Sequence, residues 1–471
     1  MRRLLCLSPL SSVWSLRSLL LSPALVALAT ASAACGSVAP GTTSDTNDTD
    51  HDAGPPHLVL PDASQGGGHE GGTGTRPPPG MVDATAPVPD ASLPPLGLTV
   101  VALAVCVPSE YTATVTLGGN ETFQMALDTG STTLGVASSQ CTDCGVSPVY
   151  TPGKTASDTD ETGMSQYGTG SWSGEIYQDN VGLGGGATAP VDLVAIDSQS
   201  QFFEPTMCDS KLAGMQGIIG FGPTAAAIPG TNAYFDQLVA TRQVPDIFAT
   251  ELCDSSGTLW LGGYDPSFTT AAPQYTPLSG GILSQYYYSV SLASITVAGV
   301  SIPVATPEYA DSVVDTGTSI FILPTTTFNA ITDAIASTPG YQTVFGTAPP
   351  DAGTASSDGG ADAGPPAPNT SWFSNPDNCV QLSATKAELD AMLPPLTLVF
   401  GSNPGIEVQA LPSESYLQAY DGYWCPALYA MDPGPDFPIA SIIGSPVLRS
   451  NIVIFDRANQ RIGFAPHTAC D

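Results

Sequence analysis

Basic side chains are scarce in this sequence: its 471 residues include 11 Lys and Arg against 43 Asp and Glu, for a formal net charge of −32. Such an acidic chain repels phosphate groups, which argues against nucleic acid or an anionic membrane surface as a partner. Two explanations of the charge stay open. Either the protein works in acid, where its carboxylates are protonated, or its surface is acidic simply for solubility.

Long hydrophobic runs are also rare. The one near the N-terminus, Leu19 to Leu28, follows Arg2, Arg3 and Arg17 and is succeeded by small residues, a pattern typical of an export signal. The run is too short and too interrupted by Pro to be a stable membrane span. We therefore expect residues 1–34 to be a signal peptide and the protein to be secreted or extracytoplasmic.

Two processing sites compete at the end of this segment. Ala31-Ser32-Ala33 suits an ordinary signal peptidase, whereas Ser32-Ala33-Ala34-Cys35-Gly36 resembles a bacterial lipobox without its usual Leu. In the second case Cys35 would carry a lipid, and the protein would be a bacterial outer-membrane or cell-surface lipoprotein. That lipid is the only membrane attachment that the sequence predicts.

The composition predicts one folded region behind a tether. Gly 49 and Pro 44 favour loop-rich β architecture. Residues 35–96 are acidic and rich in Pro and Gly, and we expect them to be a disordered tether because they cannot bury enough apolar surface to fold. The folded domain would then span residues 97–471, with an N-terminal lobe at about 97–280, a C-terminal lobe at about 281–471 and a low-complexity insertion at 348–369.

Of the ten Cys, Cys6 lies inside the expected signal peptide, and Cys35, directly after it, is the lipidation candidate. The other eight are an even number, which in an exported chain predicts disulfides formed in an oxidising compartment. A metal site would rest on Cys141 and Cys144 alone, because no second Cys pair and no His cluster stand at ligand spacing. We therefore expect no metal and no cofactor.

A short motif occurs twice: Asp128-Thr129-Gly130-Ser131 and Asp315-Thr316-Gly317-Thr318. Each copy follows a short apolar run, and each is followed later by an apolar strand that ends in Gly, at 217–220 and 441–444. Two such strands, each ending in a tight loop, can bring two carboxylates face to face. The duplication predicts an all-β fold with two related lobes and a cleft between them.

Two adjacent carboxylates hold one proton between them over a broad acidic range. The ionised Asp can then take a proton from water, while the other Asp hydrogen-bonds the carbonyl oxygen of a peptide. The neighbouring residues fit this chemistry: glycines allow close approach with their N–H groups, hydroxyls can bond the outer carboxylate oxygens, and the two Thr can tie the loops together. These supporting residues are, in that order, Gly130 and Gly317, Ser131 and Thr318, and Thr129 and Thr316.

On these motifs the sequence resembles the pepsin family of aspartic proteases over roughly residues 108–471. The resemblance implies a bilobal fold in which Asp128 and Asp315 are the catalytic pair. It also implies that Tyr167, Gly168 and Thr169 belong to a flap hairpin that folds over the substrate. The expected activity is endopeptidase cleavage of peptides or unfolded proteins in acid, and a monomer suffices because both halves lie in one chain.

The resemblance also implies disulfide pairs. Cys141–Cys144 and Cys379–Cys425 match bridges of the pepsin family, and Cys253–Cys470 resembles a bridge of the memapsin branch. Cys106 and Cys208 are then left as the fourth pair.

One segment and one residue depart from the family pattern. Residues 36–107 are acidic, with Arg76 as the one basic residue, where the family usually has a basic inhibitory prosegment. Gly135 stands where pepsin has a Trp that supports the flap Tyr, which predicts a roomier pocket on that side. The alternative function is a catalytically inactive pepsin-like binding or inhibitor protein. Such proteins usually lose an Asp or the flap Tyr, whereas this chain keeps all three.

Overall fold

The computed structural model of the chain describes residues 97–107, 109–119, 121–168, 170–184, 186, 188–203, 215–304, 309–346, 369–375, 378–401, 405–420, 422–434, 438–468 and 470. These described residues belong to one compact unit. The expected signal peptide, the tether with Cys35, and the insertion up to residue 368 lie outside the described residues.

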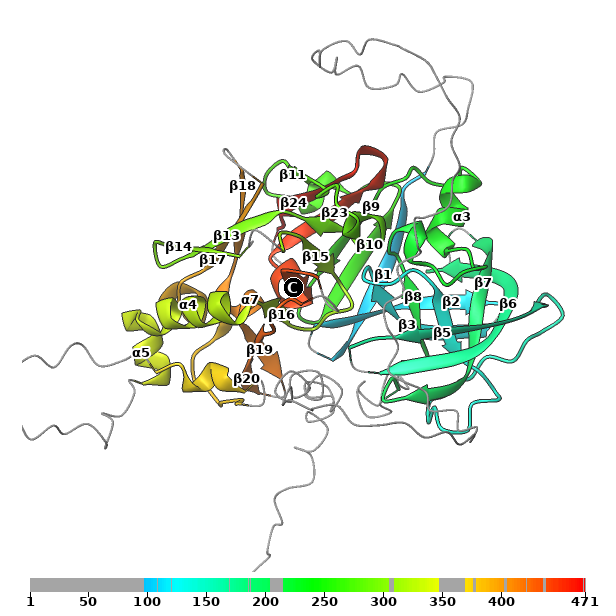
Figure 1. Cartoon of the computed structure of the whole chain (residues 1–471), viewed down its shortest axis with the longest axis horizontal. Helices are drawn as coiled ribbons and strands as arrows, with labels where there is room; N and C mark the ends of the chain where they lie inside the picture. The colour runs from blue at the N-terminus through cyan, green and yellow to red at the C-terminus, as the bar shows by residue number, and fades with distance from the viewer. Residues whose placement is uncertain are drawn as a thin grey trace, which may run out of the picture. The chain divides into compact units, whose positions relative to one another are not determined.

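The largest sheet in the described part of the chain has thirteen strands. It joins strands from the beginning and the end of this region. Strand β23, which pairs with β24, lies beside β9, and β10 and then β1 follow on the other side of β9 (Figure 1). In spatial order the strands are β11 (Gln274–Pro277), β24 (Arg461–Pro466), β23 (Asn451–Asp456), β9 (Phe248–Leu252), β10 (Ser256–Leu261), β1 (Thr99–Val107), β2 (Glu110–Leu117), β3 (Glu121–Asp128), β8 (Gly217–Gly220), β4 (Leu134–Ala137), β7 (Thr188–Ser200), β6 (Ser171–Leu183) and β5 (Ser157–Gln166).

Three smaller sheets come from the second half of the sequence. The first is β12 (Ser289–Val290), β15 (Ser312–Asp315), β22 (Ser441–Gly444), β16 (Phe321–Leu323) and β21 (Leu428–Ala430). The second is β14 (Val300–Pro303), β13 (Leu292–Val297), β17 (Leu396–Phe400) and β18 (Ile406–Ala410), and the third pairs β19 (Leu417–Tyr420) with β20 (Tyr423–Pro426).

Helices are short, and α3, α4 and α5 lie at the outer sides of the molecule in the view of Figure 1. The α-helices are α3 (Tyr234–Ala240), α4 (Thr325–Ala336), α5 (Pro339–Phe345), α6 (Lys386–Met392), α7 (Pro412–Ser415) and α8 (Ser445–Leu448). The 3-10 turns are η2 (Thr224–Ala226), η3 (Pro266–Phe268), η4 (Leu283–Gln285), η5 (Ser371–Ser374) and η6 (Arg457–Asn459). Helix α4 begins directly after Pro324, and its first N–H group, on Thr325, donates to the Asp432 carboxylate at 2.8 Å.

Alternating sequence explains the hairpin that leads to the first Asp-Thr-Gly loop. In β2, Tyr111, Ala113, Val115 and Leu117 point into the core, as the period of two in a strand requires. The chain then turns at Gly118 and Gly119, whose φ angles of 58° and 92° favour Gly, and returns as β3. Strand β3 becomes fully buried toward its end, so Asp128 enters the interior of the domain.

The two halves repeat one topology around the duplicated motif. Strand β3 runs parallel to β8, with Asp128 opposite Gly220, and β15 runs parallel to β22, with Asp315 opposite Gly444. The next strand in each half, β4 or β16, then pairs antiparallel with the same Gly-ending strand. The sequence duplication is therefore a structural one, and the predicted all-β, pepsin-like fold with two related halves is confirmed.

Candidate active site

The glycines of the two motifs bring the two carboxylates together. A methyl group placed on Gly130 would lie 2.7 Å from the carboxyl carbon of Asp315, and one on Gly317 would overlap the Asp128 carboxylate. Each glycine is thus packed against the acid of the other loop, where any side chain would displace that acid. The structure brings Asp128 and Asp315 into direct proximity, as the sequence predicts.

Thr129 and Thr316 tie the two loops together by reciprocal hydrogen bonds. The Thr129 hydroxyl accepts from the Thr316 N–H at 2.9 Å and donates to Val314 O at 3.2 Å. The Thr316 hydroxyl accepts from the Thr129 N–H at 3.1 Å and donates to Leu127 O at 2.8 Å. Both Thr side chains are buried, so these four bonds are shielded from water and fix one loop relative to the other.

Each carboxylate is held by donors of its own loop. Gly130 N–H donates to Asp128 Oδ1 at 2.8 Å, and the Ser131 hydroxyl donates to Asp128 Oδ2. In the second loop, Gly317 N–H donates to Asp315 Oδ1 at 2.8 Å and the Thr318 hydroxyl donates to Asp315 Oδ2 at 2.6 Å. Both oxygens of each acid have a donor, so neither carboxylate is free to rotate.

The two acids differ in environment. Asp128 is 4% exposed, whereas Asp315 is only partly buried. Burial raises the pKa of Asp128 well above its usual value, and the neighbouring Asp315 charge raises this pKa further, against the opposite effect of the Ser131 and Gly130 donors. Burial and the neighbouring carboxylate thus both favour the protonated form of Asp128.

The segment from Tyr167 to Gly170 connects β5 to β6 in a hairpin. Tyr167 N–H donates to Gly170 O at 2.7 Å, which closes the turn; Gly168 lies exposed within it, and Thr169 is outside the described residues. Burial first, and then the charge of Asp128, raises the pKa of the Tyr167 phenol. Because the charge of Asp128 acts on it, the phenol lies near the carboxylate pair, and its raised pKa keeps it protonated.

Tyr167 belongs to an aromatic group that the sequence did not reveal. Its ring lies 5.3 Å from that of Phe202 and 6.2 Å from that of Trp172, and Phe202 lies 4.9 Å from Phe203, measured between ring centroids. We call Tyr167, Trp172, Phe202 and Phe203 the aromatic wall. The signals that could have revealed it were the adjacent pair of Phe residues and a Trp in the second strand of the expected hairpin.

The space beside Gly135 is not empty, contrary to our expectation of a roomier pocket there. The Trp172 indole fills it: a methyl group on Gly135 would come within 3.0 Å of Trp172 Cζ2 and 3.2 Å of Ile196 Cδ1. Trp172 is 2% exposed, so its indole is almost fully enclosed by the fold. A large side chain at 135 would therefore compete with Trp172 for one place.

A second phenol approaches the carboxylates from the C-terminal half. Tyr287 packs with Leu283, Val313 and Ile439. Burial raises the pKa of Tyr287, and the charges of Asp315 and Asp128 raise it further. Sequence reasoning missed this residue because one Tyr among three in a row, 286–288, carries no pattern that singles it out.

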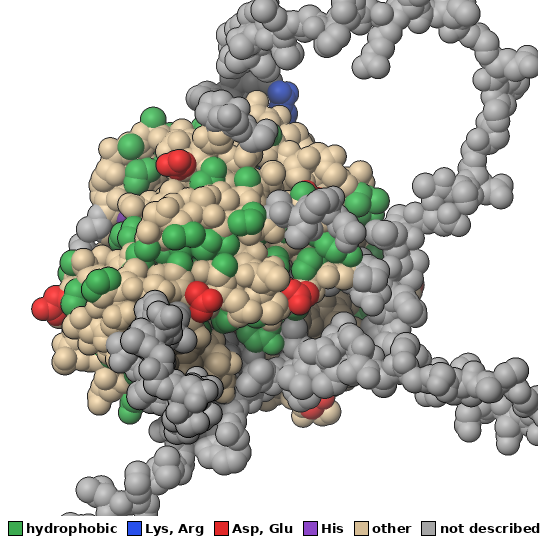
Figure 2. Space-filling model, turned by 60° about the vertical axis from the view of Figure 1, so that its left-hand side comes forward, with side chains coloured by type: hydrophobic (Ala, Val, Ile, Leu, Met, Phe, Trp, Pro, Cys, Tyr) green, Lys and Arg blue, Asp and Glu red, His purple; other side chains and the backbone are tan. Residues whose placement is uncertain are grey.

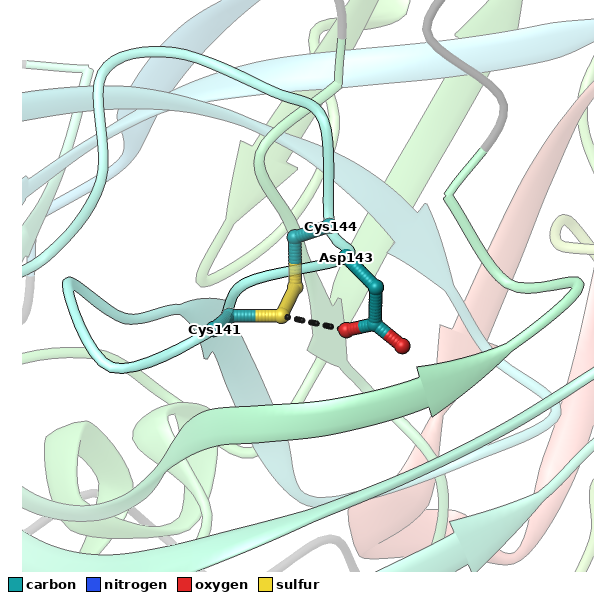
Figure 3. Close-up of side chains that lie close together, drawn as sticks. All are labelled: Cys141, Asp143 and Cys144. Carbon is teal, nitrogen blue, oxygen red and sulfur yellow. Dashed lines mark hydrogen bonds between the residues drawn. A yellow bond between two sulfur atoms is a disulfide. The ribbon is translucent and has the colours of Figure 1, made fainter.

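Three expected disulfides are present, with S–S distances of 1.99 Å for Cys141–Cys144, 1.94 Å for Cys253–Cys470 and 2.04 Å for Cys379–Cys425. The proposed partner Cys208, the Cys106 side chain and the lipidation candidate Cys35 lie outside the described residues. Asp143 Oδ1 lies 3.3 Å from Cys141 Sγ (Figure 3). The two sulfur atoms are bonded to each other, so Cys141 and Cys144 do not offer thiolates to a metal here.

One other group of potential metal ligands occurs in the described part of the chain: Glu251, His467 and Cys470. Cys470 is likewise bonded to Cys253.

None of the described helices combines the length and the apolar character that a membrane crossing requires.

The amino-acid sequence matches the family described as "Eukaryotic aspartyl protease" over residues 110–467. It is 30% identical over 221 residues to an aspartic protease of Phaffia rhodozyma, a match covering 46% of this chain and 51% of that protein. It is 27% identical over 381 residues to a beta-secretase of Strongylocentrotus purpuratus, covering 73% of this chain and 64% of that protein.

A third relative is matched over nearly its whole length. Pepsin-2B of Gadus morhua is 25% identical over 367 residues, which cover 76% of this chain and 96% of the pepsin. The chain therefore spans about half of the Phaffia protease and just under two thirds of the beta-secretase, but almost all of the pepsin. The family match over residues 110–467 agrees with the duplicated Asp-Thr-Gly loops. The chain therefore belongs to the eukaryotic aspartyl protease family.

Proposed function

We propose that the chain is an aspartic endopeptidase that hydrolyses peptide bonds in acid, using a water molecule activated between Asp128 and Asp315. The observation that carries this proposal is the packing of Gly130 and Gly317 against the opposite carboxylates. Like charges so close together cannot both ionise, and a shared proton is characteristic of the carboxylate pair in aspartic proteases.

The environment of Asp128 supports a proposal for the starting role of each acid. The raised pKa of Asp128 favours the protonated form there. Asp315 then takes a proton from the water as it attacks the peptide carbonyl carbon, and Asp128 donates its proton to the carbonyl oxygen. When the tetrahedral intermediate breaks down, the amine leaves with a proton returned from the pair. The hydrogen bonds from Gly130, Ser131, Gly317 and Thr318 keep the oxygens in place throughout.

The substrate is proposed to be a peptide or unfolded protein chain that lies under the flap. The residues assigned to that flap are Tyr167, Gly168 and Thr169, and the aromatic wall offers an apolar surface to a substrate side chain. Trp172 would support Tyr167 in place of the Trp that pepsin carries at the position of Gly135. Both catalytic halves are in one chain, so a monomer suffices.

The decisive experiment compares the full exported chain with Asp128→Asn on an unfolded protein substrate at about pH 4, where one proton per pair is expected. The wild type should cleave, a pepstatin-type inhibitor should stop it, and Asp128→Asn should lose activity. Asp197→Asn, a change at an exposed Asp of β7, should keep full activity. Full activity in Asp128→Asn would reject the assigned pair. A wild type inert across the acidic and neutral range would favour an inactive binding protein.

We also propose that the protein is exported and that its signal peptide is removed, either after Ala33 or directly before Cys35. Determining the mass of the mature N-terminus separates the two processing routes: a free small residue indicates ordinary cleavage, whereas a lipid-modified Cys35 indicates a lipoprotein. The variant Cys35→Ser should release the protein from membranes only in the second case.

A further inference from the structure

The Gln199 side chain lies at the end of β7 and makes three hydrogen bonds with two other segments. It is half-buried and stands one residue before the end of the strand. Its amide oxygen and its amide nitrogen point to different parts of the molecule. The oxygen faces the backbone of the aromatic wall, and the nitrogen faces the loop closed by Cys141–Cys144.

The oxygen fixes the turn that carries Phe202 and Phe203. Gln199 Oε1 accepts from Phe202 N–H at 2.9 Å and from Phe203 N–H at 3.3 Å. An amide oxygen has two lone pairs, so it can satisfy both groups at once. Between Gln199 and Phe202 the chain passes through Gln201, whose φ of 55° is in the left-handed region that non-glycine residues adopt rarely. The Gln199 side chain therefore stabilises a turn that the backbone alone does not favour.

The nitrogen anchors this turn to a rigid loop. Gln199 Nε2 donates to Asp143 O at 3.0 Å, and Asp143 lies between the two Cys of the disulfide (Figure 3). Cys144 is 1% exposed and packs in the same apolar cluster as Trp172, Phe202 and Phe203. Because the loop is closed by a covalent bond and buried at one end, its carbonyl is a fixed point for the Gln199 amide.

The same turn also contacts the flap hairpin directly. In the pairing of β6 with β7, Gln199 is the residue opposite Trp172. A methyl group on Gly170, in the turn of the flap hairpin, would lie 2.6 Å from Ser200 O, so the two backbones already touch. A shift of the 199–203 turn would therefore move the Phe202 ring and also the flap hairpin that carries Tyr167 and Trp172.

We propose that Gln199 is a positioning residue that holds the aromatic wall under the flap and thereby sets which substrate side chains fit beside the cleaved bond. It acts through Phe202, Phe203 and Trp172 and not through the carboxylates. The inference rests on the proposed role of the flap in substrate binding. It predicts an effect on KM and on side-chain preference, with the proton chemistry of the pair unchanged.

The test uses the full chain with three variants. Gln199→Leu keeps the size of the side chain and removes all three bonds. Gln199→Glu keeps an acceptor for the two Phe N–H groups and loses the donor to Asp143 O. The control is Gln243→Leu, because the Gln243 side chain also donates to a backbone carbonyl, Thr188 O at 2.9 Å, at the opposite end of β7.

Two readouts are measured: kcat and KM for peptides with Phe, Leu or Ala before the cleaved bond, and amide hydrogen exchange of residues 197–203 and 164–172. In Gln199→Leu we expect KM for the Phe peptide to rise about tenfold, because two partly buried N–H groups lose their acceptor and the wall shifts. The Ala peptide should change little, the pH profile of kcat should stay that of the wild type, and both segments should exchange faster. Gln199→Glu should lie between Leu and wild type, and Gln243→Leu should match wild type.

The outcomes separate this inference from the proposed function. Unchanged exchange and unchanged KM in Gln199→Leu would overturn it, as would an equal effect of Gln243→Leu or a shifted pH profile of kcat. If the wild type cleaves nothing, the proposed function fails while the exchange data still decide whether Gln199 holds the turn. If Gln199→Leu does not fold, Gln199→Glu carries the same comparison, since it loses one bond of the three.

Discussion

The hydroxyl groups of Thr129 and Thr316 are buried, and each acts both as an acceptor and as a donor of a hydrogen bond. Thr316→Val has nearly the same shape but lacks both functions. The Thr129 N–H and the Leu127 carbonyl would be left buried without their partner, and we expect the free energy of unfolding to fall by about 2–4 kcal/mol. Activity should fall as well, because the loops that position the carboxylates would be less well fixed.

Chemical denaturation and kcat at one acidic pH check this prediction for Thr316→Val. The matched control is Thr332→Val in α4, which is 2% exposed and whose hydroxyl donates to carbonyls of its own helix, Phe328 O and Asn329 O. Those carbonyls already accept helical N–H groups, so this change should have a small effect and leave kcat intact. Equal decreases in the free energy of unfolding and in kcat for the two variants would show that the Thr316 hydrogen bonds contribute no more than those of an ordinary buried Thr.

At the scale of elements, rings on α5 and η5 hold together the two sides of the expected insertion. Phe345, at the end of α5, lies 4.5 Å from Trp372 of η5 between ring centroids, and Tyr341 stacks on Phe345 at 4.6 Å. The chain on either side of residues 347–368 is therefore joined by apolar packing. We expect replacement of 347–368 by a short Gly-Ser linker to leave Tm and activity near the wild-type values, since loop length changes stability only slowly.

Thermal unfolding and the peptide assay test this replacement. Trp372→Ala in the otherwise intact chain is the contrasting variant: it removes a side chain that is 6% exposed, and it should destabilise the protein by about 3–5 kcal/mol. A large loss of Tm in the shortened chain would mean that residues 347–368 contribute contacts of their own.

The sequence predicted those elements that a short local pattern encodes. Asp128 and Asp315 were found because an apolar strand followed by Asp-Thr-Gly can be recognised within a few residues of sequence. The aromatic wall, Gln199 and Tyr287 were missed because their neighbours are distant in sequence. Trp172, for instance, fills the space beside Gly135 through the fold and not through any spacing. Helix α6 was missed although Thr385 and Glu388 form a capping box, a signal that the sequence does contain.

At the scale of the whole molecule, several buried or partly buried carboxyl groups make the folded state more stable in acid. Burial raises the pKa of Glu110 from 4.5 to about 7, and burial is also the largest cause of the raised pKa of Asp246, Glu251 and Asp390. Such groups bind more protons in the folded state than in the unfolded state. The folded state is therefore stabilised as the pH falls. Figure 2 adds that acidic side chains on the face shown lie apart from one another, which limits their mutual repulsion.

We expect Tm to rise as the pH is lowered through the window from about 7 to 4.5, the folded and unfolded values for Glu110. Below this window the trend should reverse, because Asp265 and Glu388, whose pKa values are lowered by hydrogen bonds, lose those bonds on protonation. Calorimetry across the range measures the profile. Glu110→Gln should raise Tm at pH 7 and leave it unchanged near the acidic end, and a Tm highest at neutral pH would contradict the prediction.

The position of β23 and β24 in the large sheet has a consequence for how the protein is made. These two strands, close to the C-terminal residue of the sequence, lie between β11 and β9. During synthesis the first half of the chain emerges with a gap in this sheet that only the final strands can fill. Strands β9 and β11 each keep an unpaired edge until β23 and β24 have been made, so the large sheet stays incomplete for that time. The large sheet of this protein therefore closes late in synthesis, once β23 and β24 are present.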